Sequence, residues 1–124
     1  MKKIMLLSIL LVIGSVFVGC SLMYTTQNLS NSSKVTAGML NEDVMKIMGK
    51  PVISELYNNV EEWHYCTTGS RDKFLVIFFV ENRVIAKKYY LGKDDVGDCS
   101  IFVKTGDYKI PPEVQDILDK KKVK

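Results

Sequence analysis

The chain has 124 residues, of which 47% are hydrophobic and 25% are charged, and its formal net charge is +3 at pH 7. Two of the positive charges, Lys2 and Lys3, lie in a segment that we expect to be removed, so the remainder is close to neutral. This excludes the strongly basic balance of a nucleic-acid-binding protein, and the length allows one small domain with one core.

The N-terminal residues have the layout of a secretory signal peptide. A pair of lysines is followed by an apolar run over residues 4–18, which ends at Gly19 directly before Cys20. The run is shorter than the roughly 20 apolar residues that a membrane-spanning helix needs. We therefore expect residues 1–19 to be a signal peptide that is cleaved off.

The residues around this cut, Val18-Gly19-Cys20, resemble the lipobox of bacterial lipoproteins. In that family the cysteine is acylated and becomes the new N-terminus, and two or more acyl chains anchor a protein stably. The resemblance implies lipid attachment at Cys20, although Phe17 stands where leucine is usual. Ser21, in place of an aspartate, implies the outer membrane. The alternative is an ordinary signal peptide with Cys20 left as a free thiol.

Two cysteines remain after the leader, Cys66 and Cys99. An even pair in an oxidising compartment favours a disulfide, and two free thiols are the alternative. The bond would stabilise a domain of this size by about 3–4 kcal/mol.

The first part of the mature chain predicts a tether and two helices. Residues 20–33 are polar and without periodicity, which is typical of a flexible tether after the acylated cysteine. A helical turn is expected over residues 34–38, and a longer helix between the N-cap Asn41 and Gly49. One face of the longer helix is apolar, formed by Val44, Ile47 and Met48.

Three strands are expected next, in an antiparallel meander over residues 61–66, 73–80 and 84–91. Residues 53–59 are expected to form a connection that ends in a turn at Asn58-Asn59. A second reversal lies at residues 81–83, where Asn82 best tolerates a positive φ angle.

The faces of these strands predict how the sheet is covered. In the first strand, Trp63 and Tyr65 point to one face while His64 and Cys66 point to the other. The second strand is apolar on both faces, so both need cover. The two helices cover one face, and we expect the segment 99–118 to cover the other, pinned there by the disulfide.

The fold class is therefore α+β, with two short N-terminal helices packed on a three-stranded antiparallel meander. Residues 34–91 form this domain, and residues 92–124 form a C-terminal extension of a loop and a helix over about 112–120. The lysine-rich end, residues 120–124, is expected to be a solvated terminus. The alternative is weak attraction to anionic lipid or glycan.

Four short motifs follow one another between residues 35 and 90. They are Val35-x-x-Gly38-Met39-x-x-x-x-Val44, Met48-Gly49-x-Pro51, Trp63-x-Tyr65 and Phe79-x-x-x-x-Val84. Their order and spacing resemble the SmpA/OmlA (BamE-like) outer-membrane lipoproteins. The resemblance implies an ααβββ domain that serves as an accessory, non-catalytic subunit of the outer-membrane β-barrel assembly machinery. Leu40 and Asn82 depart from the family pattern, and the cysteine pair and the residues after Leu91 lie outside it.

Catalytic chemistry has little support in the sequence. The one histidine, His64, shares a strand face with Cys66, and a Cys–His nucleophile is conceivable there. A disulfide at Cys66 would remove it, so a structural histidine on the sheet surface is the expected role. The scattered acids lack the arrangement of a metal site, and no glycine-rich phosphate loop is present. We expect no catalytic residue, metal, cofactor or small-molecule substrate.

The expected partners are membrane lipid, through acylated Cys20, and an envelope protein complex, with the domain facing the periplasm. The resemblance implies that this complex is the β-barrel assembly machinery. Trp63, Tyr89 and Tyr90 are the candidate partner-binding residues if their rings face outward, because exposed aromatic rings dominate many interfaces. The alternative is that most of the aromatic residues of the strands, Trp63 among them, belong to the core. The alternative is a lipid-anchored binding or inhibitor-type module outside that machinery, and a small thiol-dependent enzyme is a third hypothesis.

Overall fold

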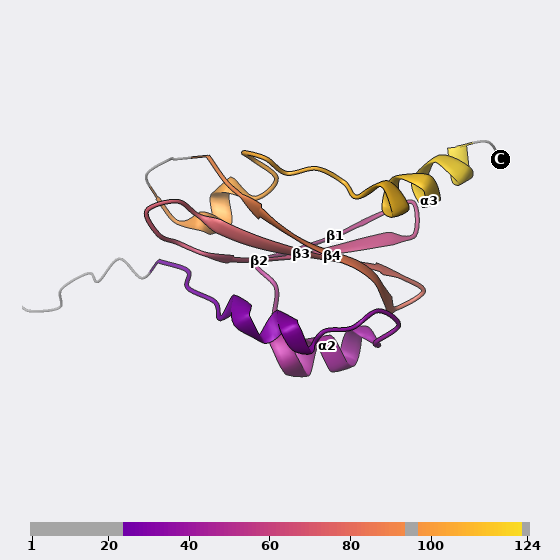
Figure 1. Cartoon of the computed structure of the whole chain (residues 1–124), viewed down its shortest axis with the longest axis horizontal. Helices are drawn as coiled ribbons and strands as arrows, with labels where there is room; N and C mark the ends of the chain where they lie inside the picture. Colours follow the sequence, from indigo (N-terminus) through magenta and orange to yellow (C-terminus); the bar gives the residue numbers. More distant parts are fainter. Residues whose placement is uncertain (1–23, 94–96, 123–124) are drawn as a thin grey trace, which may run out of the picture.

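Four antiparallel strands form the sheet at the centre of the computed structural model, which describes residues 24–93 and 97–122. They lie in chain order, each hydrogen-bonded to the next: β1 Ile53–Tyr57, β2 Val60–Thr67, β3 Lys73–Val80 and β4 Arg83–Leu91 (Figure 1). The predicted signal peptide and Cys20 lie outside the described residues. No helix in the described ranges is long and apolar enough to span a membrane.

Helical segments lie on both faces of this sheet (Figure 1). One face, called the helix face below, carries the 3-10 helix η1 (Leu29–Lys34) and the α-helix α2 (Asn41–Met48). The other, the extension face, carries residues 97–122 with the 3-10 helix η2 (Cys99–Phe102) and the α-helix α3 (Pro112–Lys122). The predicted α+β class is confirmed, but the sheet has four strands rather than three and the helices are arranged differently.

Strand β1 occupies residues that we expected to be a connection. Its ladder with β2 begins with Tyr57 opposite Val60, across a turn at Asn58 and Asn59 with φ angles of 48° and 57°. Two successive residues with positive φ match the twist of a tight β-hairpin. The turn prediction is confirmed, whereas the connection is wrong. Four of the five residues of β1 are exposed, so no alternation of apolar and polar residues marked the strand.

The polar segment before η1 is bound to the sheet. Thr26 forms a β-bridge with Thr67, and the side chain of Gln27 accepts a hydrogen bond from the backbone N–H of Cys66 at 2.8 Å. The backbone N–H of Gln27 in turn donates to the carbonyl of Cys66 at 3.2 Å. The flexible tether predicted over residues 20–33 is therefore wrong from residue 25 onward, because polar side chains there bond the backbone of β2.

The two N-terminal helices begin at other residues than predicted. The turn expected over residues 34–38 is replaced by η1, which ends at Lys34. The predicted N-cap Asn41 is the first helical residue of α2, and the N-cap position belongs to Leu40, which forms no side-chain cap. Leu40 pairs with Arg83 in a β-bridge, so contact with β4 sets the start of this helix. Gly49 ends the helix as predicted, with φ 77°.

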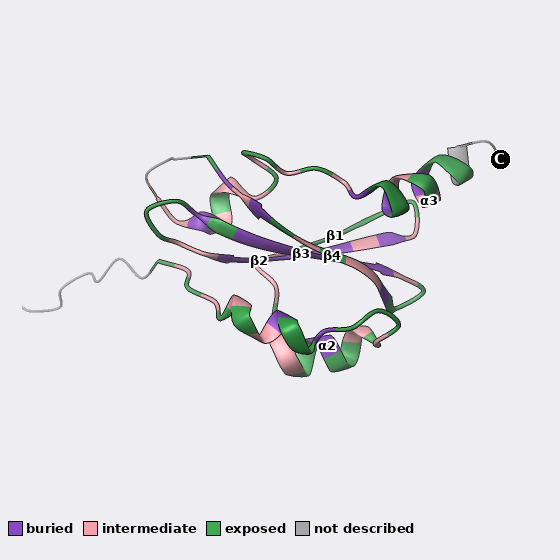
Figure 2. Cartoon of the chain, viewed as in Figure 1, coloured by how far each residue is buried: buried purple, intermediate pink, exposed green. Residues whose placement is uncertain are grey.

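The core lies on both faces of β3, whose residues from Phe74 to Phe79 are at most 1% exposed. Figure 2 shows this burial concentrated in the central strands. On the helix face the buried cluster is Val35, Val44, Trp63, Tyr65, Leu75, Ile77, Phe79 and Val84. On the extension face it is Val60, Cys66, Phe74, Val76, Phe78, Tyr90, Cys99, Val114 and Leu118. The predicted cover of the second face by residues 99–118 is therefore confirmed.

Candidate protein-binding site

A disulfide joins the extension to the sheet. Cys66, near the end of β2, is bonded to Cys99, the first residue of η2, and their Cα atoms lie 6.1 Å apart. Both residues are completely buried. With both sulfur atoms in this bond, neither cysteine can act as a nucleophile, so the Cys–His pair considered from the sequence does not exist in this structure.

The start of the described chain lies at the same end of the sheet. A carboxylate oxygen of Asp98 accepts a hydrogen bond from the backbone N–H of Thr25 at 2.6 Å. The hydroxyl of Thr68, in the loop after β2, accepts one from the backbone N–H of Cys99 at 2.9 Å. Hydrogen bonds from Ser100, and then those from Thr25, lower the pKa of Asp98 to about 2. Three distant segments are therefore tied together at this end.

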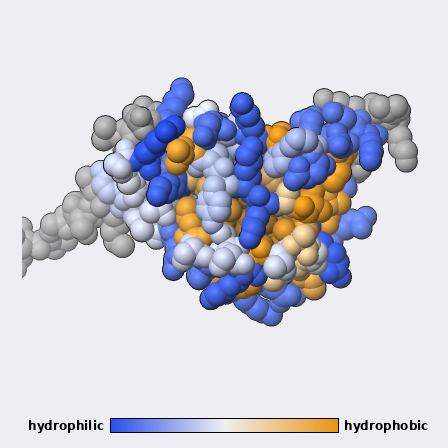
Figure 3. All heavy atoms as spheres, in the orientation of Figure 1, coloured by the Kyte–Doolittle hydropathy of each residue, from blue (hydrophilic) through white to orange (hydrophobic). Residues whose placement is uncertain are grey.

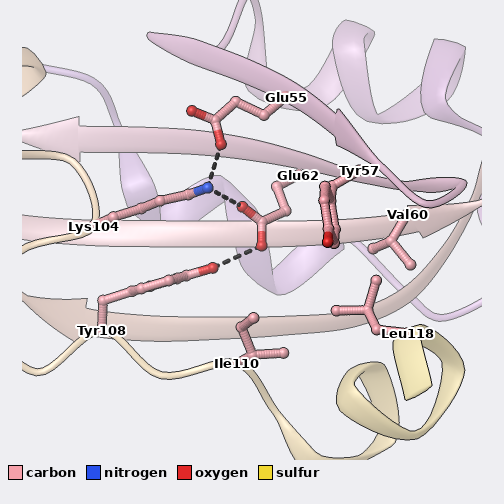
Figure 4. A pocket seen from close by; sticks show the side chains of 8 residues that line it. All are labelled: Glu55, Tyr57, Val60, Glu62, Lys104, Tyr108, Ile110 and Leu118. Carbon is pink, nitrogen blue, oxygen red and sulfur yellow. Dashed lines mark hydrogen bonds and ion pairs between the residues drawn. The ribbon is translucent and has the colours of Figure 1, made fainter. Parts of the chain in front are cut away.

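A buried polar network around Glu62 lies beneath the extension (Figure 4). One carboxylate oxygen of Glu62 accepts from the hydroxyl of Tyr108 at 2.7 Å, and the other lies 2.9 Å from Nζ of Lys104. Lys104 also pairs with Glu55 on β1. Burial raises the pKa of Glu62, but hydrogen bonds from His64, Tyr108 and Lys104 outweigh it and lower the pKa to about 2. The network holds an ionised carboxylate under the extension.

His64 is completely buried, so its predicted place on the sheet surface is wrong. The extension covers it, and both ring nitrogens have partners: Nδ1 lies 2.9 Å from the hydroxyl of Tyr90 and Nε2 lies 3.3 Å from Glu62. That tyrosine hydroxyl also accepts from the backbone N–H of Lys104 at 3.1 Å. A buried imidazole with both nitrogens bonded orders the core and has no face for a substrate. Within the described ranges, no group of three or more His, Cys, Asp or Glu side chains is placed to hold a metal ion.

Residues 25–89 match the family model of the outer membrane protein assembly factor BamE domain. This is more than half of the chain. The chain belongs to the BamE domain family. No curated protein and no solved structure gives a significant match. The matched segment begins where the chain joins the sheet and ends within β4, so it includes both N-terminal helices and nearly the whole sheet.

The three aromatic residues that the sequence predicts to contact a partner, Trp63, Tyr89 and Tyr90, differ in their exposure to solvent. Trp63 is 5% exposed and donates its indole N–H to Glu61, and Tyr90 is 4% exposed beneath the extension. Only Tyr89, on the helix face and 53% exposed, presents its ring to solvent. The expectation is therefore wrong for Trp63 and Tyr90, because the helices and the extension bury them.

The most exposed large apolar residues of the BamE domain lie on β1, which the sequence reasoning missed. Leu56 is 72% exposed and Tyr57 is 62% exposed, and both belong to an edge strand. Hydrophobic residues also reach the surface next to α3 (Figure 3). The Asn58-Asn59 turn was the one available signal, because a two-residue turn of this kind needs a strand on each side.

Proposed function

We propose that the protein is a non-catalytic, lipid-anchored subunit of the machinery that assembles β-barrel proteins in the outer membrane. The observation that carries the proposal is the match of residues 25–89 to the BamE domain of an outer membrane protein assembly factor. The lipobox-like Val18-Gly19-Cys20 supports removal of residues 1–19 and acylation of Cys20, with the domain facing the periplasm.

The bound N-terminal segment supports a domain held close to the bilayer. From Cys20 to Thr25 the chain can span at most about 17 Å, much less than a free tether ending at residue 33 would allow. Because Thr25 is hydrogen-bonded to Asp98, the disulfide end of the sheet would face the membrane. The turns at residues 58–59 and 81–82 lie at the opposite end of the strands and would point into the periplasm.

A binding role agrees with the polar groups of the extension face. Glu62 and His64 are buried and satisfied by neighbouring side chains, so they stabilise the fold instead of meeting a substrate. The exposed apolar residues Leu56 and Tyr57, in contrast, are available to another protein.

The test is affinity purification of the full-length chain from membranes in mild detergent. We expect the barrel-assembly core to be recovered with it, and mass analysis to find diacylglycerol and a further acyl chain on Cys20. A Cys20→Ala variant serves as the control and should carry no acyl chain and keep residues 1–19. Recovery of a different stable partner without the assembly core would refute the proposal in favour of a separate binding or inhibitor-type module. A mature natural chain that carries no acyl group on Cys20 would refute the lipid anchor.

A further inference from the structure

In the described part of the chain, no backbone group bonds the outer edge of β1, whereas the outer edge of β4 is bonded at both of its ends. Along β4, the backbone N–H of Gly38 donates to the carbonyl of Val84 at 2.7 Å, and the N–H of Asp107 donates to the carbonyl of Leu91 at 3.0 Å. No backbone hydrogen bond from the described part of the chain reaches the outer side of β1. The protein's own segments thus occupy the two ends of the β4 edge, whereas the outer edge of β1 is available for pairing along its length.

The hairpin register identifies the free backbone groups of β1. Tyr57 and Val60 flank a two-residue turn and form a hydrogen-bonded pair, and such pairs alternate along an antiparallel ladder. The N–H and C=O groups of Ser54 and Leu56 therefore point outward. Natural edge strands are usually protected by lysine, proline or a very short length, but residues 53–57 contain neither lysine nor proline.

On the extension face, a cavity of about 130 Å³ opens beside Tyr57 (Figure 4). Its apolar wall is formed by Val60, Ile110 and Leu118. A strand paired with β1 sends every second side chain toward this face. An aliphatic side chain of such a strand would fill the cavity and cover the exposed ring of Tyr57.

On the helix face, a shallow groove runs between α2 and β1. Met45, which is 39% exposed, and Trp63 line it, together with the carboxylates of Glu42 and Glu61. Neither carboxylate is ion-paired with a lysine or arginine in the part of the chain that the structure describes. Lys50 is the one cation that lines the groove. The groove therefore favours basic side chains.

We propose that the open edge of β1 binds an extended, alternately apolar and basic segment of a partner protein as a fifth, antiparallel strand. Its apolar side chains enter the cavity beside Tyr57, and its basic side chains lie along Glu42 and Glu61. Backbone pairing gives such a complex its affinity, and pockets for alternate side chains give it specificity. The inference rests on the proposed function only in that the chain binds another protein.

The test uses the full-length protein in detergent and the synthetic peptide acetyl-Thr-Leu-Lys-Leu-Lys-Leu-Thr-amide. Calorimetry should detect binding, and hydrogen exchange should slow at the amides of Ser54 and Leu56. In an antiparallel pair, residues directly opposite each other lie on the same face of the sheet, so the lysines lie opposite Ser54 and Leu56 on the helix face. The backbone amides of these lysines therefore point toward β1. N-methylation of the lysine amides should then weaken binding by at least about tenfold, and N-methylation of the leucine amides should leave it within about twofold. Replacing the lysines by glutamates should also weaken it, because Glu42 and Glu61 repel them.

Variants of the protein test the same edge by changing β1 instead of the peptide. Leu56→Pro removes an N–H that the β1–β2 ladder does not use, so the fold should persist while affinity falls at least about tenfold. The matched pair is Leu56→Ser, which should weaken binding, and Ile101→Ser, which should not. Ile101 is 71% exposed on η2 and lines neither the cavity nor the groove beside β1. If Leu56→Pro unfolds the chain, the comparison of the two N-methylated peptides still tests whether the segment pairs with β1.

Several outcomes would overturn the inference. They are no binding up to about 1 mM peptide, equal binding of the lysine and glutamate peptides, equal sensitivity to both N-methylations, or equal effects of Leu56→Ser and Ile101→Ser. A concentration-dependent dimer lost in Leu56→Pro would mean that a second copy occupies the edge. Peptide binding is independent of the affinity purification, so failure of one test leaves the other result standing.

Discussion

The hydroxyl of Tyr108 donates to the carboxylate of Glu62 at 2.7 Å, across 46 residues of sequence. Glu62 is 9% exposed, and the ring of Tyr108 also packs against His64 and Tyr90, with centroids 5.6 and 5.1 Å away. The contact holds the extension to β2 far from the disulfide. The extension is thus attached to β2 by a covalent bond at Cys66 and by a polar contact at Glu62.

Removing this hydroxyl should destabilise the fold. A buried carboxylate that loses a donor keeps the cost of its desolvation, so Tyr108→Phe should lower the free energy of unfolding by about 1–3 kcal/mol. Tyr57→Phe is the matched control, because Tyr57 is 62% exposed. Urea unfolding curves measure both variants. Equal stabilities for the two variants would contradict the importance of the contact.

The stability contributed by Glu62 should depend on pH. Its pKa is lowered from 4.5 to about 2 in the folded protein, so the contribution is complete above about pH 4.5 and is lost as the pH falls toward 2. The stability difference between the natural protein and Glu62→Gln should shrink over this window by up to about 3 kcal/mol. The pKa of Asp98 is also lowered to about 2, but Asp98 is present in both proteins, so its contribution cancels in the stability difference. Urea unfolding at stepped pH measures the difference, and a constant value would refute the prediction.

Breaking the disulfide should loosen the end of the sheet at which the described chain starts. Cys66 and Cys99 are 33 residues apart, and a closed loop of that length stabilises a fold by about 3–4 kcal/mol. A reducing agent, or the double variant Cys66→Ala and Cys99→Ala, should lower the free energy of unfolding by about that amount. Hydrogen exchange should speed up at Gln27, whose backbone N–H donates to the carbonyl of Cys66. Unchanged exchange at Gln27 in the reduced protein would contradict the coupling.

Two glycines with positive φ should differ sharply when replaced by alanine. A Cβ at Gly106, with φ 64°, would collide with the carbonyl oxygen of Leu91 and come within 2.6 Å of the carbonyl carbon of Gly92. A Cβ at Gly38, with φ 85°, would meet nothing within 4 Å. Gly106→Ala should therefore cost at least about 3 kcal/mol, and Gly38→Ala about 1 kcal/mol from backbone strain alone. Thermal unfolding compares the two, and similar losses would show that the clash is relieved by movement of the turn.

The parts of the fold that the sequence predicted well are those with a strong apolar pattern. The strand over residues 73–80 is apolar at nearly every position, and burial on both faces follows directly from that. The opposite directions of Trp63 and Cys66 follow from the alternation of side chains along a strand. Cover by the extension then follows from the need to bury the second face.

The missed parts carry no such pattern. Residues 53–57 form an exposed edge strand, held by backbone pairing and a tight turn, so their side chains need not alternate. Residues 25–28 are polar and are held by hydrogen bonds from side chains such as that of Gln27, which leave no periodic trace. The network around Glu62 joins residues from three separate segments, so only the three-dimensional structure brings them together.

The bridge between Thr26 and Thr67 has a mechanical consequence. A pull on the chain at Tyr24 is first resisted by the hydrogen bond from Thr25 to Asp98, and then by this bridge and the paired backbone of Gln27 and Cys66. Because Cys66 is covalently bonded to Cys99, the load passes at once into both the sheet and the extension. Tension on the N-terminus would thus be spread over the whole domain before it could peel η1 from the helix face.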